Sequence, residues 1–250
     1  MAALARSARR RLLGRHFERR IGHLGGNRSA LDAMLALHHC VMDETDHFIL
    51  SKGHAAGALY ITLWSLGLLS DSDLATFLAD GTLLAGHPVP GWNDRIPVAT
   101  GSLGHGFPVA LGMALARHLN GEPGHTYCLT SDGEWQEGVM WEALIFFAHR
   151  RLPNITVLID LNGLQGFGST REVASMQDLG TRLQGFGLPV VHVDGHDHEA
   201  IAAAARARPG ALIVLHTIKG KGVSFMENRM EWHYLPLTRE QYEAALGELP

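Results

Sequence analysis

The sequence has few of the features that define several large classes of protein. Cysteine occurs only twice in 250 residues, so a disulfide framework and a cysteine-rich zinc module are both excluded. No apolar run approaches the roughly 18 residues that a transmembrane helix needs, so no membrane partner is expected. Lysine occurs only three times and the net charge is -4, which argues against general nucleic-acid binding. The chain instead has 46% hydrophobic residues and 29 glycines, a composition typical of a globular protein rich in tight turns.

Arginine is concentrated in the first 20 residues, which hold seven arginines against a single acidic residue. An arginine-rich, acid-poor N-terminus can be a transit peptide. We favour an exposed first helix over residues 1–22, because Leu4, Leu12, Leu13 and Phe17 are spaced to give it an inner face. Arginine also outnumbers lysine by 18 to 3 in the whole chain, so the bias is not confined to this segment.

Hydrophobic periodicity predicts strands and helices that alternate along most of the chain. The expected strands are His47–Ser51, His125–Ser131, Asn154–Asp160, Val190–Asp194 and Ala211–Thr217. The expected helices are Ser29–His39, Ala55–Leu66, Asp71–Leu78, Gly106–Leu119, Trp135–His149, His198–Arg206 and a last helix that begins at Thr238. Strands that are apolar throughout and alternate with helices predict an α/β fold, a doubly wound, mostly parallel sheet with helices on both faces. No repeat or linker divides the chain, so we expect a single domain over residues 1–250.

Two of the expected strands end in residue types that bind metal ions. Asp132 follows the strand His125–Ser131, and Asn162 follows the next strand, 30 residues further on. Because the carboxyl ends of adjacent parallel strands share one edge of a sheet, this carboxylate and this amide should lie side by side. Oxygen ligands of this kind suit Mg²⁺ or Ca²⁺, and Gly133 lets the backbone approach an anion. A simpler interpretation is that Asp132 only caps the helix that follows it.

Several segments, taken in order, resemble transketolase. SDGEWQEGVMWEA followed by IDLNGLQ is similar to the thiamine diphosphate signature, and RIGHLGGN is similar to an early turn of the family. Four further segments resemble transketolase in particular: LSKGHAAGALY, AGHPVP, TGSLGHG and TIKGKGVSFMENRMEWH. These matches run from residue 20 to residue 233, nearly the whole chain. The resemblance implies the thiamine diphosphate-binding fold of the N-terminal half of transketolase (the PP module), in the form that exists as a separate subunit.

The resemblance implies thiamine diphosphate and Mg²⁺ as cofactors. Asp132, the side chain of Asn162 and the carbonyl of Leu164 would hold the metal ion. The residues implied to contact the cofactor itself are Lys52, His54, Gly101, Ser102, Leu103, Gly133 and Lys219. Two departures from the family pattern, Ser131 and His105, stand close to these residues, and their effect is left open.

The resemblance also implies how the subunit works. His23, His87 and His233 match positions that line the donor and acceptor channel, where histidines can transfer protons and bind sugar hydroxyls. The glutamate that activates the aminopyrimidine ring would come from a C-terminal transketolase subunit with the pyrimidine-binding domain. We therefore expect self-association and a two-plus-two complex, with Trp135–His149 and Gly101–Leu119 as contact surfaces. Transfer of a two-carbon ketol unit from a ketose to an aldose, in the cytoplasm, is the expected activity.

Two other functions are compatible with the sequence. The E1 alpha-type chain of a 2-oxo acid dehydrogenase would also supply the diphosphate half of the site from a separate chain. A catalytically inactive scaffold or regulatory subunit could keep the fold alone. The histidines favour sugar chemistry over the first, and the intact Asp132 and Asn162 weigh against the second. The identity of the sugar, and whether it is phosphorylated, stays open.

Overall fold

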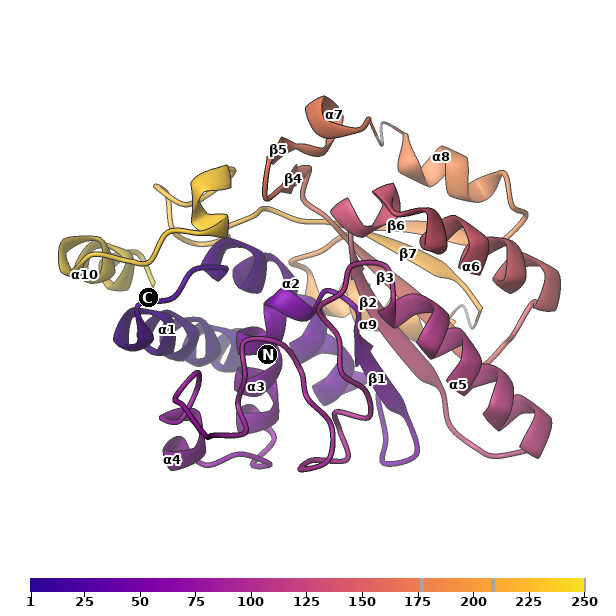
Figure 1. Ribbon diagram of the computed structural model, residues 1–250, viewed down its shortest axis with the longest axis horizontal. Coiled ribbons are helices and arrows are strands. Elements are labelled where there is room, and N and C mark those ends of the chain that lie inside the picture. Colours follow the sequence, from indigo (N-terminus) through magenta and orange to yellow (C-terminus); the bar gives the residue numbers. More distant parts are fainter. Residues whose placement is uncertain (176–177, 208–209, 250) are drawn as a thin grey trace.

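The computed structural model describes residues 1–175, 178–207 and 210–249, and its centre is a five-stranded parallel sheet (Figure 1). The strand order is β1-β2-β3-β7-β6, and every neighbouring pair is parallel. The strands are β1 (His47–Leu50), β2 (Thr126–Ser131), β3 (Ile155–Leu161), β6 (Val190–Asp194) and β7 (Leu212–His216). A two-stranded antiparallel hairpin, β4 (Leu164–Gln165) and β5 (Gly168–Ser169), follows β3 outside the sheet. The predicted α/β class and parallel sheet are confirmed.

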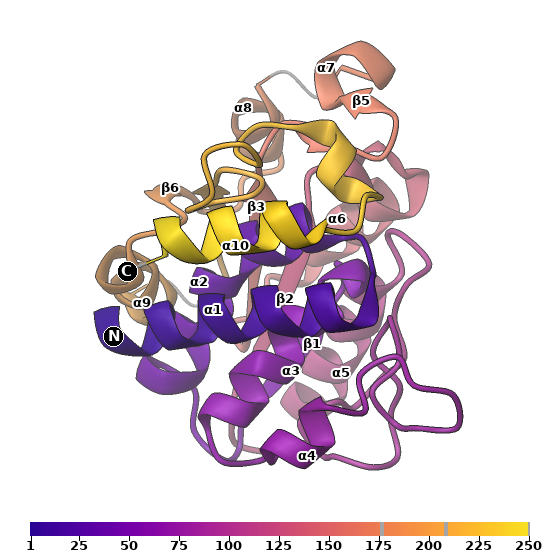
Figure 2. The same ribbon diagram turned by 90° about the vertical axis from the view of Figure 1, so that its left-hand side faces the viewer.

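Helices cover both faces of the sheet, as the apolar strands require (Figures 1 and 2). On one face lie α1 (Ala2–Arg19), α2 (Leu24–Cys40), α3 (Ala56–Ser65) and α9 (His198–Ala207), with α10 (Arg239–Glu248) beside α1. On the other lie α5 (Gly106–Asn120), α6 (Gly138–Arg150) and α8 (Leu179–Gln184). Alternate strand residues feed the two cores: Leu158 and Ile213 face the first, Val157 and Val214 the second.

The connections reverse direction in the middle of the sheet. The chain runs outward from β1 to β2 and β3, skips to the far edge at β6, and returns through α9 to β7. Since crossovers between parallel strands are right-handed, α6 and α8, which follow β2 and β3, lie on one face, and α9, on the returning connection from β6, lies on the other. The carboxyl ends of β2, β3 and β7 therefore meet beside the point of reversal, where ligands bind in folds of this kind.

Most predicted elements are present, with differences at their ends. The first helix after residue 22 begins at Leu24 rather than Ser29, so its glycines are helical and buried. The helix expected over Asp71–Leu78 is the single turn α4 (Asp71–Leu74), since Leu78 has a left-handed backbone with φ 54°. The helix expected from Trp135 is a 3-10 turn, Gly133–Gln136, followed by α6.

Other parts of the chain agree with or add to the prediction. Residues 82–100 contain no helix or strand, and the last helix begins as predicted after Thr238, which caps it. The sequence pattern did not predict the β4–β5 hairpin, α7 (Thr170–Val173) or α8. The remaining short elements are 3-10 turns at Gly53–Ala55 and Met230–His233.

Five of the arginines of α1 are engaged within the chain. Arg9 forms an ion pair with the buried Asp32, Arg11 pairs with Asp71 and lies over the Trp64 ring, and Arg15 pairs with Glu18. Two more bind backbone carbonyls: Arg10 those of Leu246 and Leu249, Arg19 that of Ala75. Leu12 and Leu13 are fully buried, so the expected helix with an inner face is confirmed. No helix in the described part of the chain is long and apolar enough to cross a membrane.

Candidate functional site

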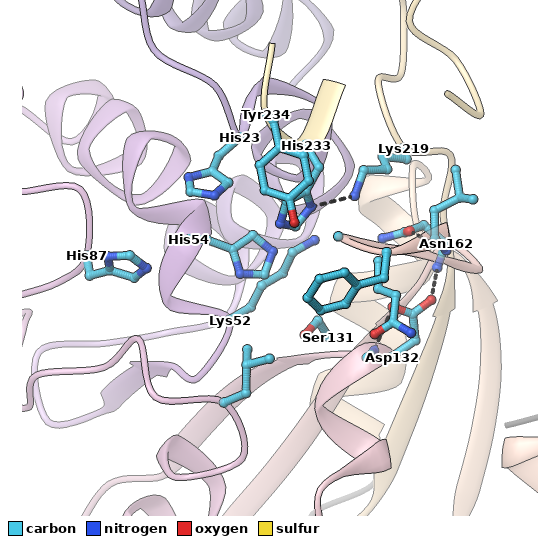
Figure 3. Close-up of a pocket in the computed structure, with 16 residues that line it drawn as sticks. His23, Lys52, His54, His87, Ser131, Asp132, Asn162, Lys219, His233 and Tyr234 are labelled. Atoms are coloured by element: carbon cyan, nitrogen blue, oxygen red, sulfur yellow. Dashed lines mark hydrogen bonds between the residues drawn. The ribbon is translucent and has the colours of Figure 1, made fainter. Parts of the chain in front are cut away.

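A cavity of about 300 Å³ opens at the carboxyl edge of the sheet, beside the ends of β2, β3 and β7 (Figure 3). Eleven of the thirteen residues predicted for the site line it. They are His23, Lys52, His54, His87, Leu103, Asp132, Gly133, Asn162, Leu164, Lys219 and His233. The other lining residues are Ser131, Gln165, Gly166, Phe167 and Tyr234. The structure thus brings together residues that are up to 210 positions apart in the chain.

Gly101 and Ser102 lie near the cavity but are not part of its wall. A Cβ atom on Gly101 would lie 2.8 Å from the ring of His87, so this glycine allows the histidine ring to pack against the backbone. Gly101 also has φ 137°, which a residue with a side chain rarely adopts. Ser102 accepts a hydrogen bond from the His105 amide at the start of α5.

Asp132 lies at the base of the cavity and is 1% exposed. Its Oδ1 accepts a hydrogen bond from the Gly133 amide at 2.9 Å, so it does cap the following turn. Its Oδ2 accepts from the Asn162 and Gly163 amides at 3.1 and 2.6 Å, which joins the β2 and β3 turns. Burial, and secondly the nearby Asp160, raise the pKa of Asp132 to about 6. A bound cation would stabilise the charged form of Asp132 and so oppose this rise in its pKa.

The Asn162 side chain is held in place at both ends. Its Oδ1 accepts from the Leu164 amide at 3.1 Å, and its Nδ2 donates to Asp160 Oδ1 at 3.2 Å. The amide oxygen thus faces the turn that Asp132 also binds, as the 30-residue spacing predicted. Within the described residues no three His, Cys, Asp or Glu side chains gather as metal ligands. A cation here would therefore have one carboxylate and neutral oxygen ligands, a set that leaves room for phosphate oxygens.

Asp160 is a functional residue that the sequence reasoning missed. It is fully buried beneath the cavity, and its Oδ2 lies 2.5 Å from Lys52 Nζ and 2.7 Å from Ser29 Oγ. Thr217 donates to its other oxygen. Although burial opposes its charge, Lys52 and these hydrogen bonds keep its pKa below the ordinary value. Asp160 therefore fixes the position of the Lys52 ammonium. Its place two residues before Asn162 was the only signal for it in the sequence.

Lys219 is a buried cation without a carboxylate partner. It is 1% exposed, and no carboxylate of the described residues lies within 4.0 Å of its Nζ. Its contact is with His233 Nδ1, at 3.0 Å. Burial, followed by repulsion from Lys52, lowers the pKa of Lys219 to about 8. An unpaired ammonium in such a position is arranged to receive an anion.

Four histidines stand together on the opposite wall (Figure 3). The ring centre of His23 lies 5.6 Å from that of His54, 6.3 Å from that of His87 and 5.1 Å from that of His233. Burial lowers the pKa of His23, His54 and His233, with repulsion from neighbouring cations and histidines as the next cause. The pKa of His233 falls to about 3. These three rings are therefore neutral at pH 7.

Glu134 is a second residue that sequence reasoning missed. Its buried carboxylate accepts hydrogen bonds from Ser51 Oγ at 2.5 Å, the Gly104 amide at 3.0 Å, and the Ser131 amide and hydroxyl at 2.8 and 3.0 Å. It joins the ends of β1 and β2 to the loop before α5. Ser131, the departure from the family pattern, is thus accommodated as one more donor to Glu134.

Replacing Glu134 with glutamine should destabilise the fold. An amide nitrogen would face groups that donate, so one or two hydrogen bonds would be lost and a donor buried without an acceptor. We expect the free energy of unfolding to fall by about 2–4 kcal/mol in chemical denaturation. Glu137→Gln, an exchange at an exposed position nearby, is the matched control and should change stability by less than about 0.5 kcal/mol. Equal stability of the two variants would show that this network contributes little.

The geometry can be compared with that of known proteins. Residues 39–248 match the family described as transketolase, thiamine diphosphate binding domain. The chain belongs to the transketolase family. It is 38% identical to an apulose-4-phosphate transketolase subunit of Phocaeicola vulgatus, over 96% of this chain and 90% of that one. It is 37% identical to a 6-deoxy-6-sulfo-D-fructose transketolase subunit of a Clostridium species, over 92% and 88%.

Solved transketolases share the fold. The structure of transketolase from Leishmania mexicana superposes with a TM-score of 0.90 and 28% identity. That match covers 99% of this chain but only 41% of the transketolase, so the chain spans about two-fifths of the solved protein. Human transketolase is 36% identical over a third of its own length. The relatives of similar length to this chain are themselves named as subunits.

These matches confirm the expected family, fold and subunit type. The chain is the thiamine diphosphate-binding subunit of a transketolase-type transferase. They also decide between the two enzyme classes left open, because the relatives named above are transketolases rather than oxo-acid dehydrogenases.

Proposed function

We propose that this chain transfers a two-carbon ketol unit from a ketose to an aldose when it is paired with a subunit that carries the pyrimidine-binding domain. The main support is the cavity itself, in which a buried lysine with no described carboxylate within 4.0 Å and four clustered histidines face the same space. The first suits a diphosphate and the second suits sugar hydroxyls. An inactive scaffold would have no need to keep either.

The charged end of the cavity fits a metal diphosphate. We assign Asp132, the Asn162 side-chain oxygen and the Leu164 carbonyl to Mg²⁺. Asp132 is the one carboxylate among the described lining residues, and burial and the nearby Asp160 raise its pKa, an effect that a bound cation would oppose. Lys219, unpaired and buried, and Lys52, held by Asp160, would bind the phosphate oxygens. Gln165 Nε2, a buried donor with no partner in the described structure, also faces this cavity.

The remaining predicted contacts would surround the rings of thiamine diphosphate. His54, Leu103 and Gly133 line the cavity, and a Cβ atom on Gly133 would lie 3.4 Å from the Gln165 side chain. Gly101 and Ser102 would take part through the position of the loop that carries Leu103. The cofactor, when bound, supplies the carbon that accepts the ketol unit and stabilises its negative charge.

The neutral histidines set the hydrogen-bond pattern around the sugar. Lys219, when charged, can only donate, so His233 Nδ1 accepts from it and the ring proton lies on Nε2. His233 therefore offers an N–H donor, which suits a sugar oxygen that gains negative charge in the reaction. The ring centres of His23 and His87 are 6.3 Å apart. Each ring can accept a hydrogen bond from a sugar hydroxyl or donate one to it.

The described residues of the cavity do not supply every group that the reaction needs. Activation of the aminopyrimidine ring needs a carboxylate, and the only carboxylate on the described cavity wall is Asp132, which we assign to the metal. Asp160 is buried and paired with Lys52. Glu134 is buried and accepts hydrogen bonds from Ser51, Gly104 and Ser131. We therefore propose that the glutamate comes from the partner subunit.

Exposed apolar side chains at the cavity and on α5 and α6 are consistent with that partner. Phe167 at the tip of the β4–β5 hairpin is 84% exposed and Tyr234 is 54% exposed, and both line the opening. Val109 on α5 and Ile145 on α6 are 42% and 59% exposed, on the two segments predicted as contact surfaces. We propose self-association and a two-plus-two complex, with interfaces above about 2,000 Å² as in obligate assemblies.

The described lining residues indicate which part of the substrate this chain does not bind. The two relatives above are named for a sugar phosphate and a sulfosugar. No arginine is among the described lining residues, and both lysines lie at the diphosphate end. We propose that the substrate is a sugar or sugar phosphate whose charged end is bound by the partner subunit. We also propose a cytoplasmic location, since both cysteines are unpaired, as is usual in reducing compartments.

Substitution of the channel histidines tests the proposed role. In the complex with the partner, His87→Ala and His233→Ala should each lower kcat by about 10²-fold or more, because proton transfer and sugar binding are impaired. Calorimetry should show unchanged thiamine diphosphate affinity for His87→Ala, but weaker binding for His233→Ala, which releases Lys219. His192→Ala, an exposed position on β6 outside the cavity wall, is the control. Normal turnover of both variants would remove these residues from the channel.

A further inference from the structure

A second buried charged cluster lies outside the cavity, where α1, α2 and the β6–α9 turn meet. Asp32 of α2 is 0% exposed and forms an ion pair with Arg9 of α1, with the closest atoms 2.5 Å apart. His196 Nδ1, from the β6–α9 turn, lies 2.8 Å from Asp32 Oδ2. His198 Nε2 lies 3.0 Å from Asp32 Oδ1. Such a network stabilises the packing of three helices, but one of its members has another contact.

His196 also binds the backbone of the segment that carries Lys219. Its Nε2 lies 2.9 Å from the Ile218 amide nitrogen. A backbone amide can only donate, so Nε2 must be the unprotonated nitrogen and the ring proton must lie on Nδ1, where it is donated to Asp32. The ring is thus a neutral bridge with one fixed tautomer between a buried carboxylate and a backbone N–H.

The bridge lies where the sheet no longer supports the chain. The last backbone hydrogen bond between β6 and β7 runs from the Gly195 amide to the His216 carbonyl, at 2.9 Å. Ile218 lies beyond this last hydrogen bond. Its amide donates to the His196 ring instead of to the carbonyl of a neighbouring strand. The segment is held further on by a hydrogen bond from the Gly220 amide to the Gly25 carbonyl, at 3.0 Å. Lys219 lies between these two anchors.

We propose that His196 is a positioning residue, which fixes the Ile218 amide and thereby holds the Lys219 ammonium where the diphosphate binds. This inference rests on the proposed function, because it assigns Lys219 to the diphosphate. His196 does not touch the cavity, so it acts through the backbone alone. Asp32 and Arg9 hold the ring in place, and the mechanism needs no change in their charge.

Two substitutions separate the contacts of His196. The amide oxygen of glutamine can replace the Nε2 acceptor to Ile218, whereas the amide nitrogen of asparagine can replace the Nδ1 donor to Asp32. We expect His196→Asn to weaken Mg²⁺-dependent binding of thiamine diphosphate by about 10-fold or more, and His196→Gln by less than about 3-fold. In the assembled enzyme, the KM for thiamine diphosphate should rise in His196→Asn with kcat at saturation unchanged. His198→Asn, which alters a contact with Asp32 only, is the matched control and should bind normally.

A purely structural role gives a different pattern. His196→Asn and His196→Gln would then lose thermal stability and affinity in parallel, and this result would overturn the proposal. A measurement on the unmodified chain guards against variants that fail to fold. Nitrogen-15 NMR of His196 should show the proton on Nδ1, and hydrogen exchange should show a protected Ile218 amide. A proton on Nε2, or rapid exchange, would also overturn it. If the unmodified chain binds no thiamine diphosphate while both observations hold, the proposed function fails and the bridge stands.

Discussion

Replacement of Asp132 with alanine is expected to abolish Mg²⁺-dependent binding of thiamine diphosphate while the fold survives. Asp132 is the only carboxylate on the described wall of the cavity, so without it the protein would offer a metal ion neutral oxygen ligands alone. The dissociation constant should rise by more than about 100-fold, because the removed charge is buried and faces both the proposed metal site and the turn after β3.

The fold should tolerate this change because Asp132 is not well stabilised in the free chain. Burial and Asp160 raise its pKa to about 6, so its charge costs free energy when no cation is bound. The lost hydrogen bonds to the Gly133, Asn162 and Gly163 amides oppose this gain, and the midpoint of thermal unfolding should move by only a few degrees.

Asp132→Asn is the matched control for size and hydrogen bonding. It retains an oxygen acceptor but no charge, so it should bind nearly as weakly as the alanine variant. Isothermal titration with thiamine diphosphate, with and without Mg²⁺, would measure both. Unchanged affinity in Asp132→Ala would show that the metal is held elsewhere. The assignment of Asn162 and Leu164 as metal ligands would then also be wrong.

Replacement of Lys219 with methionine should have opposite effects on binding and on stability. Methionine fills a similar volume without the charge, so diphosphate affinity should fall by about 100-fold or more. The ligand-free chain, in contrast, should become more stable at pH 7. Burial lowers the pKa of Lys219 from 10.5 to about 8, which corresponds to a cost of about 3 kcal/mol for the charged form.

The sign of the pH dependence follows from the same shift. Between pH 8 and 10.5 the unfolded chain holds a proton on this lysine that the folded chain has lost, so stability rises with pH in this window. Below about pH 8 the cost is present in full. Denaturant unfolding of the ligand-free chain from pH 7 to 10 should show this rise, and Lys219→Met should lack it. Measurements stop at pH 10, and the difference from Lys219→Met isolates this lysine from other buried groups. The raised pKa values of Cys128, Tyr60 and Tyr127 oppose the rise, whereas the pKa of Arg28, lowered to about 9, adds to it.

A flat profile in the unmodified chain, or a less stable methionine variant, would show that Lys219 has a counter-charge when the site is empty. Lys221→Met is the control, because Lys221 is part of the same segment but is partly exposed and lies 3.9 Å from Glu227. It should change neither the affinity nor the pH profile.

The sequence predicted the site residues at the edge of the sheet better than the buried residues beneath them. Asp132 and Asn162 could be paired in advance, because strand–helix–strand spacing alone places successive strand ends together. The pairing of Ser131 with Asp160 across β2 and β3 bears this out. Asp160 and Glu134 could not be found this way, since their partners Ser29, Lys52 and Ser51 come from distant elements and no local pattern relates them.

Local structure was misjudged where tertiary contacts override propensity. Glycines near the start of α2 argue against a helix, yet Gly25 and Gly26 are helical. Glycine suits these positions because Lys219, Trp232 and His54 pack where a side chain would project. The β4–β5 hairpin has only two residues per strand, too few for a periodic signal. The arginines of α1 were interpreted correctly as structural, but their partners, such as Asp32 for Arg9, could not be named from the sequence.

Ketol transfer by the purified chain tests most directly whether this chain is half of an active site. Ketose donors and aldose acceptors would be supplied with Mg²⁺ and thiamine diphosphate, first to the chain alone and then to the chain with a pyrimidine-domain subunit. We predict no transfer by the homogeneous chain and robust transfer by the complex, because the described cavity wall has no second carboxylate to activate the aminopyrimidine ring. Robust transfer by the chain alone would contradict the half-site assignment.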